Sequence, residues 1–205
     1  IETADIAALS TAVMRSLGAD QLAALGTGQM AALSTTQVAA LTPTQLASLA
    51  TEDVAALGSA QVAVLTSAQL AALSAEQVAK LDAGDLAAVG TAALRGLGVD
   101  AMAALTTAQV AALTTAQAAS ISSTQLAALT TAGLAAITSA DIKALSPSAL
   151  ASLNAEQVGA LTSTQLSAMS SAQIAALPTD PVSLGGLSTA DVANHARIIE
   201  DLSKT

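Results

Sequence analysis

Large aliphatic residues recur along this chain at a fixed spacing of eight. From Glu2 to Leu177 the sequence divides into twenty-two octads without insertion or deletion, and every octad ends in Leu, Val, Ile or Met. In the octad Thr106–Leu113, which reads TTAQVAAL, the large apolar residues stand at positions 5 and 8. A period this regular predicts a tandem-repeat architecture in which each unit packs on its neighbours.

The octad period excludes one continuous helix. Eight residues advance an α-helix by about 800°, so the apolar stripe would drift by roughly 80° per octad and no single partner could cover it. A strand is no better, because positions 5 and 8 would point to opposite faces and because Ala, Leu and Gln favour helix. The chain is therefore expected to break and restart once in every octad.

Position 1 has the residues that start helices. Ser, Thr, Asp or Asn stands there in fifteen octads and Gly in five, and these are the preferred N-cap residues. The only prolines of the array, Pro43 and Pro147, fall at position 2, which suits the first helical residue. Position 4 is Gln in thirteen octads, and Gln three residues after Ser or Thr predicts a capping box. Each octad should form one helix of about seven residues.

Charged residues follow the same register. All eleven acids of the array occupy positions 1 to 4, and its four bases, Arg15, Lys80, Arg95 and Lys143, occupy positions 6 or 7. This is the sign pattern that a helix dipole favours. We therefore predict an all-α fold: a solenoid or superhelix of very short capped helices, one per eight-residue repeat.

The domain organisation follows from where the octads stop. Residues 1–177 are predicted to form the octad-repeat solenoid, with twenty-two units from residue 2. Residues 178–187, rich in Pro and Gly, should form a linker. Residues 188–205 should form a C-terminal helix that caps the last layer or contacts a partner. Because Ile1 stands at position 8 of a truncated octad, we expect the chain to be a piece of a longer protein.

Composition narrows the function classes. The chain has no aromatic residue and no cysteine, so its core must consist of many thin layers of aliphatic side chains without disulfides. A net charge of -9 disfavours nucleic acid and anionic lipid, which both require a basic surface. No apolar stretch reaches the roughly 18 residues that span a bilayer. We expect neither nucleic-acid binding nor membrane insertion.

Residues able to do chemistry are few. The array contains no His, Cys or Tyr, and its four Met residues stand at positions 5 or 8, where they are expected to pack in the core. His195 lies one helical turn after Asp191, but no nucleophile or second ligand accompanies it, so we interpret it as an ordinary helix residue. The glycines of Gly96-Leu97-Gly98 are interpreted as weak caps. No catalytic, cofactor or metal site is predicted, and the chain is not expected to be an enzyme.

The one surface feature expected to repeat is a ladder of hydroxyls and amides. Its candidate contact residues are Thr107, Thr115, Ser123, Gln109, Gln117 and Gln125, at positions 2 and 4 of three successive octads. Capping alone would explain these residues. A second hypothesis is that rows of them bind a periodic partner: another copy of the array, a polysaccharide or ice.

The segment LTTAQVAAL, at Leu105 to Leu113, resembles the octad arrays of very large bacterial surface proteins that are often labelled as haem-utilisation or adhesion proteins. It is also similar to the superhelical repeats of the mesothelin and stereocilin group, where Leu-Ser-x-x-x-Leu units form stacked short helices. The resemblance covers Ile1 to Leu177. It implies a superhelical fold and an extracellular or cell-surface location on a bacterium.

Two functional hypotheses result. The first is a structural repeat protein: a stalk, spacer or self-associating filament element whose partner is itself or another surface protein. The alternative is a binding module that uses the superhelical groove or the Thr/Ser/Gln ladder to hold a protein, a polysaccharide or an ice surface. A surface with few charges and no aromatic residue is a poor source of tight binding contacts, which favours the structural hypothesis.

Overall fold

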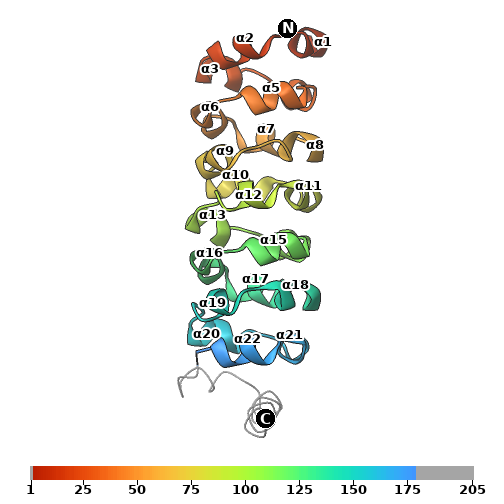
Figure 1. Ribbon diagram of the computed structural model, residues 1–205. Coiled ribbons are helices and arrows are strands. Elements are labelled where there is room, and N and C mark those ends of the chain that lie inside the picture. Colours follow the sequence, from red (N-terminus) through yellow and green to blue (C-terminus); the bar gives the residue numbers. More distant parts are fainter. Residues whose placement is uncertain (1, 179–205) are drawn as a thin grey trace, which may run out of the picture. The chain divides into compact units, whose positions relative to one another are not determined.

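Each octad of the array forms one α-helix (Figure 1). The computed structural model describes residues 2–178, and these contain twenty-two helices and no strand. The predicted all-α solenoid, with one short helix per repeat, is confirmed. Apart from Pro178, the predicted linker over 178–187 and the predicted C-terminal helix over 188–205 lie outside the described residues, as does His195.

The chain divides into two compact units, residues 1–112 and residues 113–205. The helices of the first unit are α1 (Thr3–Ala7), α2 (Thr11–Ser16), α3 (Ala19–Ala23), α4 (Thr27–Ala31), α5 (Thr35–Ala40), α6 (Pro43–Ala47), α7 (Thr51–Ala55), α8 (Ser59–Val62), α9 (Ser67–Ala72), α10 (Ala75–Lys80), α11 (Ala83–Ala88), α12 (Thr91–Leu94), α13 (Val99–Ala103) and α14 (Thr107–Ala111). Those described in the second unit are α15 (Thr115–Ser120), α16 (Ser123–Ala128), α17 (Thr131–Ala136), α18 (Ser139–Ala144), α19 (Pro147–Leu150), α20 (Ala155–Gly159), α21 (Ser163–Ala168) and α22 (Ser171–Ala176).

The helices begin where the sequence predicts. In α14 the N-cap is Thr106, whose backbone is extended and whose hydroxyl accepts a hydrogen bond from the Gln109 N–H at 3.2 Å. Pro43 and Pro147 are the first residues of α6 and α19. Position 1 is the N-cap of every described helix, including Ala50 of α7, which has no side-chain oxygen to offer. The N-cap prediction is confirmed.

The helices end earlier than predicted. They contain four to six residues rather than about seven. Position 8 leaves the helix because its backbone is extended, as at Leu41 with φ -61° and ψ 137°, so that the chain can turn into the next N-cap. No described residue has a positive φ, so none of these ends uses the left-handed glycine cap common at helix C-termini.

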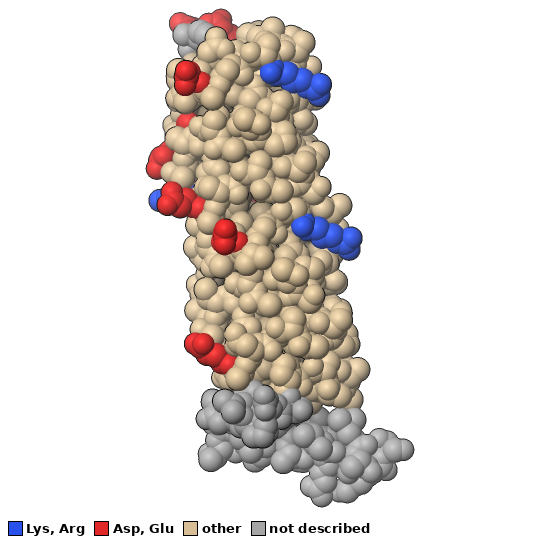
Figure 2. Space-filling view, turned by 90° about the vertical axis from the view of Figure 1, so that its left-hand side faces the viewer, with Lys and Arg blue, Asp and Glu red and all other residues tan. Residues whose placement is uncertain are grey.

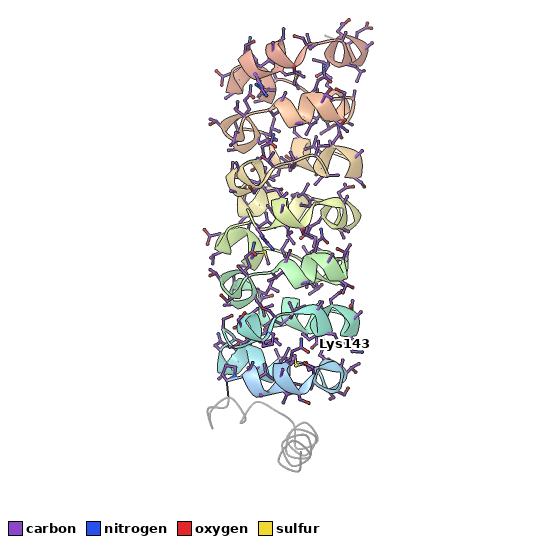
Figure 3. All side chains as sticks on the ribbon, in the orientation of Figure 1. Lys143 is labelled. Carbon is purple, nitrogen blue, oxygen red and sulfur yellow. The ribbon has the colours of Figure 1, made fainter. Side chains whose placement is uncertain are left out.

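Helices three octads apart pack against each other. In the first unit α10 contacts both α7 and α13, and in the second unit α19 contacts both α16 and α22. Each unit is therefore a stack of turns with three octads per turn. Side chains at positions 5 and 8 fill the interior: Val78 and Leu126 are fully buried, while Lys143 of α18 is exposed (Figure 3). The three buried methionines of the first unit, Met14, Met30 and Met102, pack in this core as expected.

Candidate functional site

The candidate contact residues divide into an exposed set and a buried set. Thr107, Thr115 and Ser123 are exposed, as predicted. Gln109, Gln117 and Gln125 are buried, with Gln109 only 1% exposed. The expectation that the glutamines belong to a surface ladder is therefore wrong. The local capping pattern identified their partners correctly, but it gave no information on what the other end of each amide contacts.

Gln109 joins two turns of the stack through its carboxamide. The Gln109 Oε1 accepts a hydrogen bond from the Thr106 N–H at 2.9 Å, which is the predicted capping box. The Gln109 Nε2 donates to the Val78 carbonyl at 2.7 Å and to the Leu81 carbonyl at 2.8 Å. Both acceptors belong to the octad four units earlier, at its positions 5 and 8. One amide therefore completes its own helix start and caps a helix end of the preceding turn.

The same bond pattern repeats through both units. The Nε2 atoms of the buried glutamines donate to the position-5 and position-8 carbonyls of the octad four units earlier in Gln37, Gln45, Gln61, Gln69, Gln77, Gln165 and Gln173. Gln157 differs slightly, because its amide reaches the Ala127 and Leu129 carbonyls, both at 2.9 Å. We call this set of cross-turn bonds the amide ladder.

The amide ladder satisfies carbonyls that the helices cannot. A position-5 carbonyl such as that of Val78 already accepts from the Leu81 N–H, at 3.2 Å. The Leu81 carbonyl follows the last helical turn, and among the described residues it accepts a hydrogen bond from Gln109 alone. Leaving a buried backbone carbonyl unpaired costs about 1 to 3 kcal/mol. The ladder thus stabilises both the individual turn and the contact between turns.

The exposed hydroxyls do not form one row along successive octads. Because neighbouring turns are three octads apart, the helix that packs on α15 is α18, which begins at Ser139, and not α16, which begins at Ser123. The expectation that successive octads align is therefore wrong. Position-2 hydroxyls also bond between turns where an acid is near, since the Thr115 hydroxyl donates to Asp141 Oδ1 at 2.8 Å and the Ser59 hydroxyl donates to Asp85 Oδ1.

Asp53 occupies the glutamine position of α7 and is buried, with 5% of its surface exposed. Burial raises the pKa of Asp53, and the neighbouring Glu52 carboxylate raises it further. A hydrogen bond from the Ala50 backbone lowers this pKa but has the smallest effect of the three. The pKa of Glu52 is lowered by hydrogen bonds from its own backbone N–H and the Thr51 hydroxyl, so Glu52 stays charged. An ionised Asp53 also has no hydrogen to donate to a carbonyl.

This burial predicts a pH dependence at Asp53. Because its folded pKa lies above the unfolded value of about 3.9, protonation stabilises the fold below that pH, and the gain is lost as pH rises through the folded pKa. The unfolding free energy of the wild type minus that of Asp53→Asn should therefore fall between acid pH and neutrality. Urea unfolding from pH 3 to 7 measures it, with exposed Asp20→Asn as control. A difference that stays constant with pH would contradict the prediction.

Charge is sparse on the described surface. On the face shown in Figure 2, charged side chains stand singly or in small groups among uncharged residues. The octads of α16, α19 and α22 hold no charged residue at all. Residues 2–178 contain no group of three His, Cys, Asp or Glu side chains that could hold a metal ion. No helix among these residues is both long and apolar enough to cross a membrane.

Cavities lie between stacked turns among the described residues of the first unit. One, of about 320 Å³, is bordered by Arg15, Thr42 and Gln69, and the Arg15 Nε donates to the Ala40 carbonyl at 3.3 Å. Another, of about 350 Å³, lies where Ala101 takes the place of a glutamine. Sequence reasoning missed both cavities. For the second cavity, the one available signal was alanine in the glutamine position.

Comparison with known proteins identifies the repeat. A family model described as the ALTTAQ repeat matches residues 1–35, 46–83, 78–115 and 134–171, which together make up more than half of the chain. No curated protein matches the sequence. The third match includes the TTAQVAAL octad, with the buried Gln109 and the core residues Val110 and Leu113. The chain therefore belongs to the ALTTAQ repeat family.

Proposed function

We propose that this structural repeat protein serves as a stalk, spacer or self-associating filament element of a bacterial surface or adhesin-type protein, outside the cell. The observation that carries the proposal is the amide ladder. Its acceptors are backbone carbonyls, so any octad with Gln at position 4 can join the stack, and the protein can be lengthened without redesigning its core. Such a body would function through its length and not through a reacting site, and we do not propose an enzyme.

The proposed partner is a second copy of the array or another surface protein, bound side by side. The face built from α16, α19 and α22 is the best candidate, because it carries no charge and exposes Ser123, Pro147 and Ser171 at position 2. We call these three residues the uncharged row. Sparse negative charge cannot drive attraction between copies, so contact would rely on hydroxyls and small side chains. Nucleic acid and membrane insertion are not part of the proposal.

Lateral association predicts an unusual salt dependence. Raising the salt to ~1 M shortens the Debye length to about 3 Å, which screens repulsion between like-charged copies. Assembly should therefore persist or increase in high salt. Sedimentation velocity and electron microscopy across a salt series measure this. Dissociation as salt rises would show that charge holds the copies together and would contradict the proposal.

The location of the contact can be tested with paired variants. Ser123→Glu with Ser171→Glu places two acids in the uncharged row and should weaken assembly. Thr3→Glu with Thr27→Glu is the matched control, because both of these residues are exposed at position 2 and one of them adjoins existing acids. Acids at all four positions suit a helix start, so folding should be retained.

Equal weakening of assembly by both pairs of substitutions would place the contact elsewhere. A chain that stays monomeric but retains a polysaccharide or shapes ice crystals would favour the binding module.

A further inference from the structure

The amide ladder has a gap at α13. In α10, which packs on α13, the Gln77 carboxamide accepts from the Ser74 N–H at 2.8 Å and donates to the Leu46 and Leu49 carbonyls at 3.0 and 2.8 Å. The equivalent groups at α13 are the Gly98 N–H and the Leu70 and Leu73 carbonyls. Ala101 stands in place of the glutamine and offers no amide.

The polar groups around the gap keep their hydrogen-bonding capacity. Among the described residues, the Leu73 carbonyl accepts no hydrogen bond and the Gly98 N–H donates none, while the Leu70 carbonyl accepts only from the Leu73 N–H at 3.2 Å. Leu73 is buried and borders a cavity, so its carbonyl is an acceptor with no competing donor from the described part of the chain. The gap therefore combines an unsatisfied acceptor with an unsatisfied donor.

The gap is also hollow. Leu73, Gly98 and Ala101 border the cavity of about 350 Å³, and a Cβ atom added at Gly98 would meet nothing within 4 Å. A water molecule takes up about 30 Å³ in the liquid, so this space holds a small organic group with room to spare. Val99, 51% exposed, borders the same cavity and offers an apolar contact.

We propose that this cavity is a binding site for a primary carboxamide. The NH₂ group of the ligand donates to the Leu73 carbonyl, its oxygen accepts from the Gly98 N–H, and its carbon substituent contacts Val99. A carboxylate is rejected, because it has no hydrogen for the Leu73 carbonyl and because Asp100 also borders the cavity. This site is independent of the proposed structural role, since it needs neither lateral contact nor a surface location.

Acetamide is the most specific probe. It corresponds to the CH₂–CONH₂ group that a glutamine side chain has and an alanine side chain lacks. Titrated into the intact ¹⁵N-labelled chain, it should cause saturable amide shifts confined to residues 71–75 and 98–101. Four heavy atoms limit the affinity, and we expect a dissociation constant on the order of millimolar or weaker. Acetate and N,N-dimethylacetamide, which lack the NH₂ donors, should cause no saturable shift there.

The matched variant is Ala101→Gln, which supplies the amide from the chain itself and should abolish the acetamide response. Glutamine fits this position in thirteen octads, so the variant should fold, as circular dichroism will check. A capped glutamine peptide distinguishes the source of the amide: tighter binding than acetamide assigns a protein side chain, and weaker binding assigns a small amide. Shifts that do not saturate, that persist in Ala101→Gln or that acetate reproduces would overturn the proposal.

Discussion

Replacing Gln109 with alanine should lower the free energy of unfolding by roughly 2 to 4 kcal/mol. The substitution removes the donor to the buried Leu81 and Val78 carbonyls and the acceptor of the Thr106 N–H. An unpaired buried group costs about 1 to 3 kcal/mol, and the Val78 carbonyl loses less because it keeps its bond from the Leu81 N–H. The capping box alone predicts only about 0.5 to 1 kcal/mol. Urea unfolding followed by circular dichroism measures the difference.

Gln109→Glu separates the ladder from the capping box. Glutamate keeps an oxygen for the Thr106 N–H, but it places a second oxygen against the two carbonyls that now receive Nε2. At neutral pH it should destabilise the fold at least as much as alanine. The control is Gln21→Glu, at an exposed glutamine whose Oε1 accepts from the Gly18 N–H at 2.8 Å and whose Nε2 donates to no described residue. A harmless Gln109→Glu would mean that the cross-turn bonds contribute little.

Leu113→Ala should cost about 2 to 5 kcal/mol, because it removes a large side chain that is buried at position 8. From the octad pattern alone, this loss should far exceed that of Gln109→Ala. The buried amide bonds bring the two losses to a similar size. Comparing both variants in the same urea series tests this. A loss at Gln109 several times smaller than at Leu113 would restore the view that Gln109 only caps its own helix.

The sequence predicted the local structure of this protein because its signals act over three or four residues. An N-cap such as Thr106, a proline such as Pro43 and a capping-box glutamine all act within one helical turn. How many octads form a turn depends on packing between segments about two dozen residues apart, and no local pattern encodes it. The partners of Gln109 in the preceding turn were therefore unpredictable in detail. Yet one signal was present, since position 4 never carries Glu, which caps equally well but has no NH₂ to donate.

Packing between turns also explains why the candidate contact residues at position 2 are exposed and those at position 4 are buried. Positions 2 and 4 both lie in the first helical turn, and a hydroxyl or an amide in either place is consistent with exposed capping. Only the neighbouring turn decides that Gln109 is covered and Thr107 is not. The gap at Ala101 was equally hidden, because an alanine in a helix reads as ordinary until its cross-turn acceptors are known.

Gly96 lies too close to a neighbouring turn to be replaced by any larger residue. An added Cβ would lie 2.1 Å from the Ser67 carbonyl oxygen and within 2.8 Å of two further backbone atoms of Ser67. Gly96 follows α12, and Ser67 begins α9, on which α12 packs, so the glycine serves close approach between turns and is not the weak cap that the sequence suggested. Small residues at position 7 generally permit this approach, and here even alanine is too large.

Gly96→Ala should therefore destabilise the first unit by about 1 to 3 kcal/mol or more, because a backbone must move to admit the methyl group. The control is Gly28→Ala in α4, where an added Cβ meets nothing within 4 Å. There, alanine should stabilise the helix by up to about 1 kcal/mol through its higher helix propensity. The same urea unfolding experiment measures both variants, and the expected changes have opposite signs. A neutral Gly96→Ala would mean that α9 and α12 can separate at little cost, which would weaken the inference that turns are held in close register.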